Sequence, residues 1–272
     1  MLEMGSHFGF LKKKGAMMRA LMKLGLLLII VSVVSANTSE IKVLSVTATG
    51  LMAMMEQLAP EFERTTGHKV TTTFGLAPDL RKRIDDGETF DVIILSPSSI
   101  DELTKQGKVA AGMWADFART GIGVCVPAGK PKPNIGSVEA FKRTLLSAKS
   151  ITYNPAVTSG RHVENLLQRL GIADEMKIKT VSAENKPGPG KVVGVVARGE
   201  AELGLVITTD IISDNGVEYV GPLPTELQSY IVFTAAVSKS AKDPDAAKAL
   251  IDFLKTPAAT SVIKAKGMER PE

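Results

Sequence analysis

Cysteine and histidine are nearly absent from this chain of 272 residues, and their scarcity excludes several kinds of site. Cys125 is the single cysteine, so the chain forms no internal disulfide, and its place in the apolar run 121–126 predicts a buried, inert thiol. Beyond residue 36 the histidines are His68 and His162. No zinc-ligand spacing, nucleophile triad or phosphate-binding loop is recognisable, so we expect neither a metal nor a cofactor.

An excess of positive charge is also missing once the N-terminus is set aside. The first 36 residues hold five of the 33 basic residues and one of the 29 acidic ones, which leaves 28 of each sign. The sequence pI of about 9.0 therefore belongs mainly to the N-terminus. No basic cluster is interleaved with aromatic residues, so the sequence excludes nucleic-acid binding.

A long apolar run occurs once. Basic residues precede the run at 24–34, which ends at Val34-Ser35-Ala36, small residues of the kind that signal peptidase accepts. The run falls short of the ~20 residues of a membrane-spanning helix. We therefore expect a signal peptide over residues 1–36, cleaved near Ala36, and a soluble mature protein. The alternative is an uncleaved N-terminal anchor.

What the rest of the chain does contain is a regular alternation of strand and helix. Short β-branched runs at 41–46, 70–74 and 90–95 alternate with helical stretches, and a second set follows from residue 121. This order predicts an α/β fold with mostly parallel sheets. Ligands of such sheets bind beyond the carboxyl ends of the strands, beside helix N-termini.

Four strand-to-helix junctions share a small, hydroxyl-rich character. They are residues 47–50, 75–78, 96–99 and 158–160. Small residues allow a ligand to approach backbone N–H groups, and hydroxyls add donors. The alternative is that these residues are ordinary helix caps. Because the four junctions fall in two halves of the chain, we expect them to surround one anion site.

At these motifs the chain resembles the periplasmic molybdate-binding proteins of ABC importers. The resemblance is carried by residues 43–67, which end in Phe62-Glu63-Arg64-Thr65-Thr66-Gly67, and by residues 80–87, 90–93 and 247–267. It implies a two-lobed type 2 periplasmic binding protein fold with two crossover strands and a ligand in the cleft. Lobe 1 would comprise residues 37–120 and 239–272, and lobe 2 residues 121–238. It also implies a periplasmic monomer that works with an ABC permease.

The positions that contact molybdate in that family differ here. Alignment places Gly50 and Ala77 where the family presents serines, and Ile207 where it presents a tyrosine. Ser96 and Val157 match positions where the family uses mainly backbone. A buried group without its partner costs about 1–3 kcal/mol, so the resemblance points away from molybdate itself.

Charged and polar residues near the same junctions favour a carboxylate instead. Arg81 and Arg161 could form two-pronged hydrogen bonds to a carboxylate, although Arg81 could equally lie on a solvated helix face. Tyr153 and Asn154 end a strand just before the last junction. The candidate ligand-binding residues are Thr49, Gly50, Ala77, Pro78, Arg81, Ser96, Ser98, Tyr153, Asn154, Val157, Thr158, Ser159, Gly160, Arg161 and Ile207.

Two functions follow from this set of residues. The first is a solute-binding protein that captures a small anion, a carboxylate rather than molybdate, for ABC-type import. The second is a periplasmic aconitate isomerase, an enzyme that the same family includes, with His162 as the base. A sensor or partner-presenting variant is a third possibility.

Overall fold

The computed structural model describes residues 38–183 and 191–271. The predicted signal peptide lies outside the described residues, as does the glycine-rich stretch 184–190. Within the described ranges, no helix is long and apolar enough to cross a membrane.

Three parallel strands form one side of the first sheet. β1 (Glu40–Val46) lies between β2 (Lys69–Gly75) and β3 (Val92–Leu95). Their connections are α2 (Thr49–Thr66) and α3 (Ala77–Asp85), and α4 (Pro97–Lys105) follows β3. Helix α2 ends at Gly67, whose φ of 79° is the left-handed conformation that glycine adopts readily.

A second sheet repeats this arrangement. β5 (Ile151–Tyr153) lies between β6 (Thr180–Ser182) and β7 (Leu203–Ile207), all parallel. Its helices are α5 (Val138–Ser147), α6 (Thr158–Arg169), α7 (Ala173–Lys179), α8 (Lys191–Ala197) and α9 (Thr208–Ile212).

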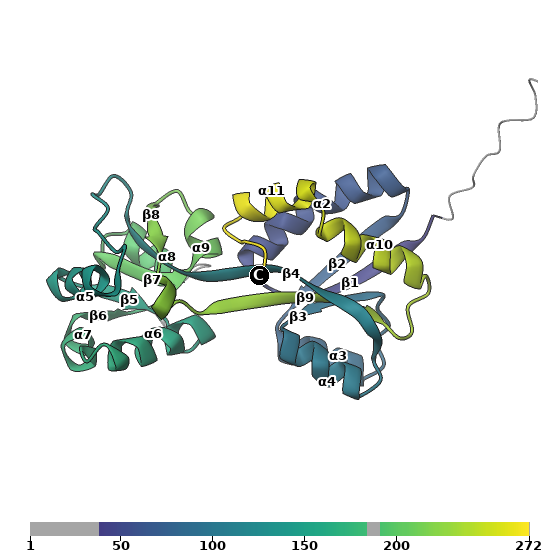
Figure 1. Cartoon of the computed structure of the whole chain (residues 1–272), viewed down its shortest axis with the longest axis horizontal. Helices are drawn as coiled ribbons and strands as arrows, with labels where there is room; N and C mark the ends of the chain where they lie inside the picture. The colour runs from purple at the N-terminus through teal and green to yellow at the C-terminus, as the bar shows by residue number, and fades with distance from the viewer. Residues whose placement is uncertain (1–37, 184–190, 272) are drawn as a thin grey trace, which may run out of the picture. The chain divides into compact units, whose positions relative to one another are not determined.

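Two long strands join the sheets. The first part of β4 (Val109–Pro127) pairs antiparallel with β9 (Tyr230–Ser238), and β9 pairs with β3. The last part of β4 pairs with β7 and with β8 (Val217–Pro222). Figure 1 shows β4 and β9 running side by side from one sheet to the other. These are the two crossover strands of the expected fold.

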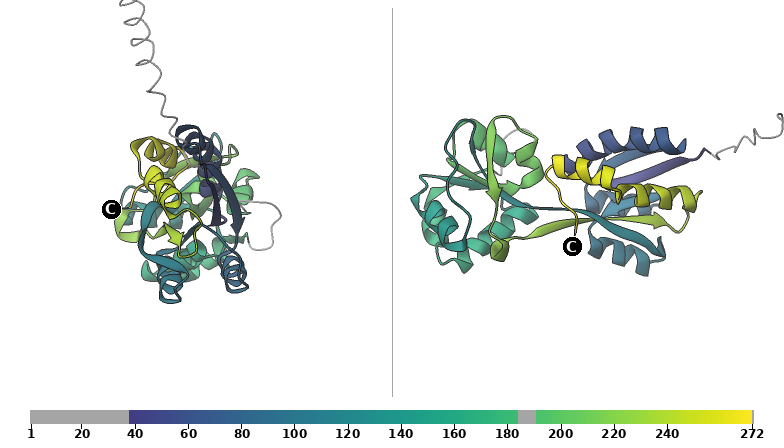
Figure 2. Two further views of the ribbon diagram at one scale, coloured as in Figure 1. Left: turned by 90° about the vertical axis from the view of Figure 1, so that its right-hand side faces the viewer. Right: turned by 45° about the horizontal axis from the view of Figure 1, so that its top comes forward.

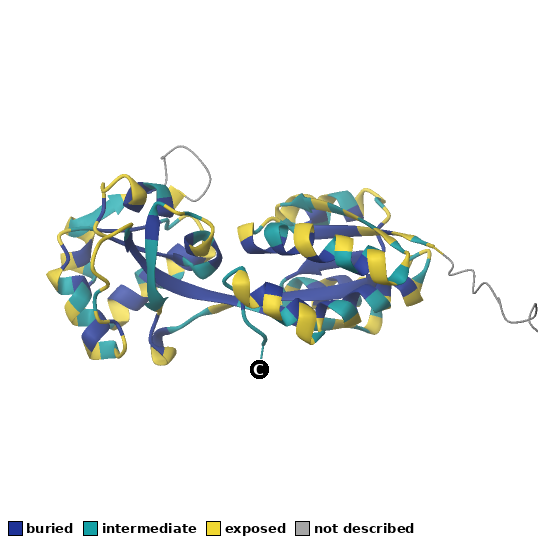
Figure 3. Ribbon diagram, turned by 90° about the horizontal axis from the view of Figure 1, so that it is seen from above, coloured by how far each residue is buried: buried dark blue, intermediate teal, exposed yellow. Residues whose placement is uncertain are grey.

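Each sheet is covered on both faces. Helices α2, α10 (Pro244–Leu254) and α11 (Pro257–Ala265) cover one face of the first sheet, and α3 and α4 cover the other (Figures 1 and 2). In the second sheet, α5, α6 and α7 pack on one face, and α8 and α9 on the other. Figure 3 shows the buried residues concentrated in the strands and on the inner faces of the helices.

The buried residues of α2 recur at helical spacing. Leu51, Met54, Leu58 and Phe62 of α2 are at most 1% exposed. Cys125 is fully buried, and burial raises the pKa of its thiol to about 12, so the prediction of a buried thiol is confirmed.

The division of the chain into lobes at 120/121 and 238/239 stays a prediction. Strand β9 falls within the range 121–238, yet Phe233, Ala235 and Val237 of β9 pack into the core that α2 and β1 form in the first lobe. Strand β9 therefore belongs to the first sheet and its core.

The C-terminal residues cross over β4. Arg119 and Glu269 form an isolated antiparallel bridge, and their side chains are ion-paired at 2.8 Å. The guanidinium of Arg270 donates to the carbonyl oxygens of Phe117 and Thr256 and to the hydroxyl of Thr260. This segment ties α11 to the part of β4 that leads into the second sheet.

Candidate anion-binding site

Two adjoining cavities lie where strands of both sheets end and helices begin. The first has a volume of about 360 Å³ and the second about 560 Å³. Ile207, Asp210 and Ile231 line both. The first is further lined by Val46, Thr47, Ala48, Thr49, Ala77, Leu95, Ser96, Val232 and Phe233, and the second by Asn154, Ala156, Val157, Thr158, Ser159, Lys191, Val192 and Val206.

The fold explains why these residues meet. Val46 and Leu95 are the last residues of β1 and β3, and Ile207 is the last residue of β7. The carboxyl ends of parallel strands lie at the same edge of a sheet, and the helix that follows each strand starts at that edge. Ile231, near the start of β9, lies between the two groups.

Three helices that begin at these cavities have no side-chain cap at their N-terminus. The residues that precede α2, α3 and α6 are Ala48, Leu76 and Val157, and none of them accepts a hydrogen bond from the first turn through its side chain. Each of these helices contributes lining residues from its start. The unpaired N–H groups and the helix dipole favour an anion.

The other described helices of eight or more residues are capped. Ser96, Ser137, Asp243 and Thr256 accept hydrogen bonds from the first turns of α4, α5, α10 and α11. Of these four capping residues, only Ser96 lines either of the two adjoining cavities. The described helices of this length that lack a side-chain cap, α2, α3 and α6, therefore all begin at the two cavities, where the capped helix α4 also begins.

The walls between these polar groups are apolar. In the first cavity, Val46, Leu95, Ile207, Ile231 and Phe233 lie among four residues with polar side chains, Thr47, Thr49, Ser96 and Asp210. Val157, which precedes α6 and lines the second cavity, is 45% exposed. Such a lining suits a ligand that has a carbon skeleton as well as charged groups.

Asp210 is the acidic residue among the described residues that line the two cavities, and the sequence analysis did not identify it. It lies in the first turn of α9, and the hydroxyl of Thr49 donates a hydrogen bond to it. Burial raises the pKa of Asp210, and the bond from Thr49 opposes that rise. The sequence did contain a signal, since Thr208-Thr209-Asp210 directly follows the apolar run 203–207, which forms β7, and resembles the four junctions that were chosen.

About half of the predicted ligand-binding residues meet at the cavities. Thr49, Ala77, Ser96 and Ile207 line the first, and Asn154, Val157, Thr158, Ser159 and Ile207 line the second. The remaining candidates, Gly50, Pro78, Arg81, Ser98, Tyr153, Gly160, Arg161 and His162, are not on either lining. As ligand contacts or catalytic groups they stay predictions.

The charged candidates interact within the protein. Arg81 is ion-paired with Glu102 at 2.7 Å. The guanidinium of Arg161 donates to the carbonyl oxygen of Ala156 and to the hydroxyl of Thr158. Nε2 of His162 lies 2.9 Å from the carbonyl oxygen of Leu227. None of these contacts directs the charged group into a cavity.

Two of the glycines act through close packing. A Cβ on Gly160 would lie 1.7 Å from the carbonyl oxygen of Asn154, so this residue lets α6 begin against the turn after β5. A Cβ on Gly50 would lie 2.5 Å from Cγ2 of Thr209.

Tyr153, another of the predicted ligand-binding residues, is buried in the second lobe, and burial raises the pKa of its hydroxyl.

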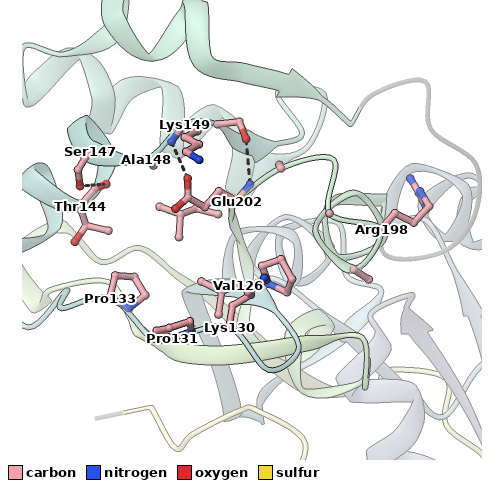
Figure 4. Close-up of a pocket in the computed structure, with 16 residues that line it drawn as sticks. Val126, Lys130, Pro131, Pro133, Thr144, Ser147, Ala148, Lys149, Arg198 and Glu202 are labelled. Carbon is pink, nitrogen blue, oxygen red and sulfur yellow. Dashed lines mark hydrogen bonds between the residues drawn. The ribbon is translucent and has the colours of Figure 1, made fainter.

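A larger cavity, of about 700 Å³, lies at the opposite edge of the second sheet (Figure 4). The ends of α5 and α8 line it through Thr144, Ser147 and Ala197. Helix C-termini carry partial negative charge, which disfavours an anion. Its carboxylate, Glu202, accepts a hydrogen bond from the backbone N–H of Lys149 at 2.7 Å. Although Lys130, Lys149 and Arg198 also line this cavity, we therefore take the two smaller cavities as the candidate ligand site.

No cluster of three or more His, Cys, Asp or Glu residues that could hold a metal ion occurs within residues 38–183 and 191–271. The lining offers backbone N–H groups and hydroxyls as donors, and Lys191 is among its residues. These groups are suited to a ligand that carries negative charge itself.

Comparison with known proteins assigns the family. Residues 43–269 match the bacterial extracellular solute-binding protein family, and the chain belongs to it. It is 30% identical to an aconitate isomerase from a Pseudomonas species over 81% of this chain and 84% of that protein. It is also 30% identical to the molybdate-binding protein ModA of Azotobacter vinelandii, over 86% of this chain and 91% of that protein.

A solved structure supports the fold. The substrate-binding domain of a candidate molybdenum ABC transporter from Clostridium difficile superposes with a TM-score of 0.76 at 20% identity, covering 86% of this chain and all of that one. The predicted resemblance and the two-lobed α/β fold are confirmed.

Proposed function

We propose that this chain is a solute-binding protein that captures a small organic anion, a carboxylate rather than molybdate, for ABC-type import. The ligand would occupy the two adjoining cavities, with its charged groups at the starts of α2, α3 and α6. Family membership supports solute binding, and the chemistry of the lining supports the choice of ligand.

One observation carries the proposal: the three described helices of eight or more residues that lack a side-chain cap all begin at these cavities. Helix stability alone would favour a cap at each of them. Leaving the N–H groups unpaired is useful where a ligand supplies the acceptor oxygens. Lys191 adds a cation to the second cavity.

The choice of a carboxylate depends on the apolar walls and on two missing hydroxyls. Ala77 and Ile207 line the first cavity at positions where the resemblance implies a serine and a tyrosine. A bare oxyanion needs polar partners on every side, because each unmatched oxygen loses its hydration. A carboxylate on a carbon skeleton needs polar partners at its ends and apolar contact between them.

The proposal includes export and a transport partner. Residues 1–36 would direct the chain to the periplasm and be removed near Ala36, and the loaded protein would act as a monomer that delivers its ligand to an ABC permease.

A thermal-shift panel tests the ligand class. The mature chain is heated with molybdate, tungstate, sulfate, citrate, cis-aconitate or trans-aconitate, each at the same concentration. A ligand at ~100 times its Kd stabilises the folded state by about 2.7 kcal/mol, so a true ligand raises Tm clearly. We expect the carboxylates to stabilise most. Stabilisation by molybdate alone would contradict the assignment.

The second candidate function is aconitate isomerase, favoured by the 30% identity to an enzyme of that name. An allylic proton shift needs a group that removes a proton and returns it at another carbon. Incubation of the mature chain with trans-aconitate, followed by detection of the cis isomer, tests this function. Turnover would assign an isomerase, whereas tight binding without turnover would support a transport receptor.

A further inference from the structure

Asp210 occupies an unexpected position for an anion site. Asp210 lines both cavities and lies in the first turn of α9. The side chain accepts a hydrogen bond from Thr49 of the first lobe. A ligand held at the starts of α2 and α6 would therefore lie beside a carboxyl group.

An ionised carboxylate there would oppose the proposed ligand. Two negative charges a few ångströms apart repel each other strongly where protein has replaced water. A protonated carboxyl has no such conflict, because it is neutral and has an O–H group to donate. The protonation state of Asp210 thus decides whether this side chain attracts or repels the anion.

The elements that pack against α9 bring few ionisable groups to Asp210. These elements are β4, β7, β8 and α2, together with the C-terminal segment, in which Gly267 lies against Thr208 and Ile212. Glu269 of this segment is ion-paired with Arg119 of β4. Residues 121–123 of β4, which surround the start of α9, are Gly, Ile and Gly, and β7 (Leu203–Ile207) is apolar throughout. The first turn of α2 has no acidic residue and contributes Thr49.

The other ionisable residues near Asp210 interact with groups of their own. On β8, the hydroxyl of Tyr219 is hydrogen-bonded to Thr208, and Glu218 is ion-paired with Lys132. Lys191 lines the second cavity together with Asp210, and Lys266 lies near Gly50 through its carbonyl oxygen. Burial raises the pKa of Asp210 more than the hydrogen bond from Thr49 lowers it. The described surroundings therefore favour the neutral carboxyl once a negative ligand arrives.

We propose that Asp210 takes up one proton when the anion binds and donates it in a hydrogen bond to an oxygen of the ligand. This inference rests on the proposed function, since it assumes that the cavities hold an anion. The proton comes from solvent and bonds to the carboxylate of Asp210, while the ligand keeps its own charge. The second oxygen of Asp210 goes on accepting from Thr49. Hydrogen bonds between a neutral O–H and a carboxylate are short and strong, which suits this pairing.

Proton counting on the unmodified protein tests the proposal directly. Binding of trans-aconitate to the mature chain is followed by calorimetry in two buffers of different ionisation enthalpy, from about pH 6 to pH 8.5. We expect uptake of close to one proton and, above the pKa of Asp210 in the free protein, a Kd that rises by about tenfold per pH unit. Binding without proton uptake would overturn the proposal and leave the proposed function intact.

Two variants locate the proton. In Asp210→Asn, an uncharged amide replaces the carboxyl, so we expect binding to persist with little proton uptake and a flattened pH dependence. Asp214→Asn is the matched control, because Asp214 lies beyond α9 and bonds the backbone N–H of Gly216 at 2.7 Å. It should keep the slope of the unmodified chain. Proton uptake retained in Asp210→Asn would refute the assignment, and a failure of every panel ligand to bind either protein would refute the proposed function itself.

Discussion

Gly50 and Thr209 meet where α2 of the first lobe contacts α9 of the second. A Cβ built on Gly50 would lie 2.5 Å from Cγ2 and 2.9 Å from Cβ of Thr209, closer than side chains can approach. Thr209 is fully buried at this contact. The neighbouring residues Thr49 and Asp210 are hydrogen-bonded, so the absence of a side chain at Gly50 brings the two lobes together beside the cavities.

Replacement of Gly50 by alanine should separate these helices. We expect Gly50→Ala to lower stability by about 1–3 kcal/mol, the usual cost of overpacking, and to weaken binding because Thr49 moves away from Asp210. Thermal denaturation and calorimetry with trans-aconitate measure both effects. Gly194→Ala is the control: this helical glycine meets only the end of the Arg198 side chain, at 3.1 Å, so alanine there should be neutral or stabilising. Equal behaviour of the two variants would contradict the packing argument.

A new cap on α6 should compete with the ligand. Val157 has the extended backbone of a capping residue, so the hydroxyl of Val157→Ser can accept a hydrogen bond from the first turn. We expect the free protein to gain about 1 kcal/mol of stability. Binding should weaken by about fivefold, since the ligand must displace this bond.

The control for this variant removes an existing cap far from the cavities. Ser137→Ala deletes the hydroxyl that accepts from Ala140 in α5, which should lower Tm and leave affinity unchanged. If Val157→Ser binds as tightly as the unmodified chain, the N–H groups of α6 do not contact the ligand.

The raised pKa of Asp210 has a consequence for stability in the absence of ligand. A carboxyl whose pKa is higher in the folded state stabilises the protein below its ordinary pKa of 3.8, and this contribution is lost as the pH rises through the folded value. Above that value the buried charge is a net cost. Asp210→Asn should therefore raise Tm near neutral pH, with a difference from the unmodified chain that narrows as the pH falls toward 3.8.

Thermal denaturation at a series of pH values checks this prediction. Asp214→Asn should show no such gain at neutral pH, because Asp214 caps a turn outside the cavities. A lower Tm for Asp210→Asn at every pH would indicate that the carboxylate is stabilising and would contradict the direction of the shift.

Local patterns in the sequence predicted the regular elements well. The strands expected at 41–46 and 70–74 are β1 and β2, whose observed bounds differ from the expected ones by at most one residue at each end, because runs of β-branched residues define both. Junctions chosen for small and hydroxyl residues did supply Thr49, Ser96 and Ser159 to the cavities.

Features that depend on the partner element were missed. β4 spans 19 residues, but its first part is partly exposed and contains Gly112, so only 121–126 showed a buried strand's pattern. Helices α7 and α9 have seven and five residues, too few for a helical period to emerge. Arg81 and Arg161 were chosen for their charge, yet their contacts with Glu102 and Ala156 depend on folding that spacing does not encode.

Arg270 offers a test of the C-terminal segment. Its guanidinium donates to the carbonyl oxygens of Phe117 and Thr256 at 2.5 and 3.0 Å and to the hydroxyl of Thr260 at 2.9 Å, and burial lowers its pKa. Arg270→Ala leaves these acceptors without their partner, which should cost about 1–3 kcal/mol and lower Tm by several degrees.

Conservative replacement separates geometry from charge. Arg270→Lys keeps the charge but lacks the planar fork that reaches three acceptors at once, so its Tm should fall nearly as far as that of Arg270→Ala. Arg143→Ala, on the exposed surface of α5, controls for loss of an arginine and should change Tm little. Full recovery in Arg270→Lys would mean that charge suffices, and the hydrogen bonds to Phe117, Thr256 and Thr260 would then not hold the segment against β4.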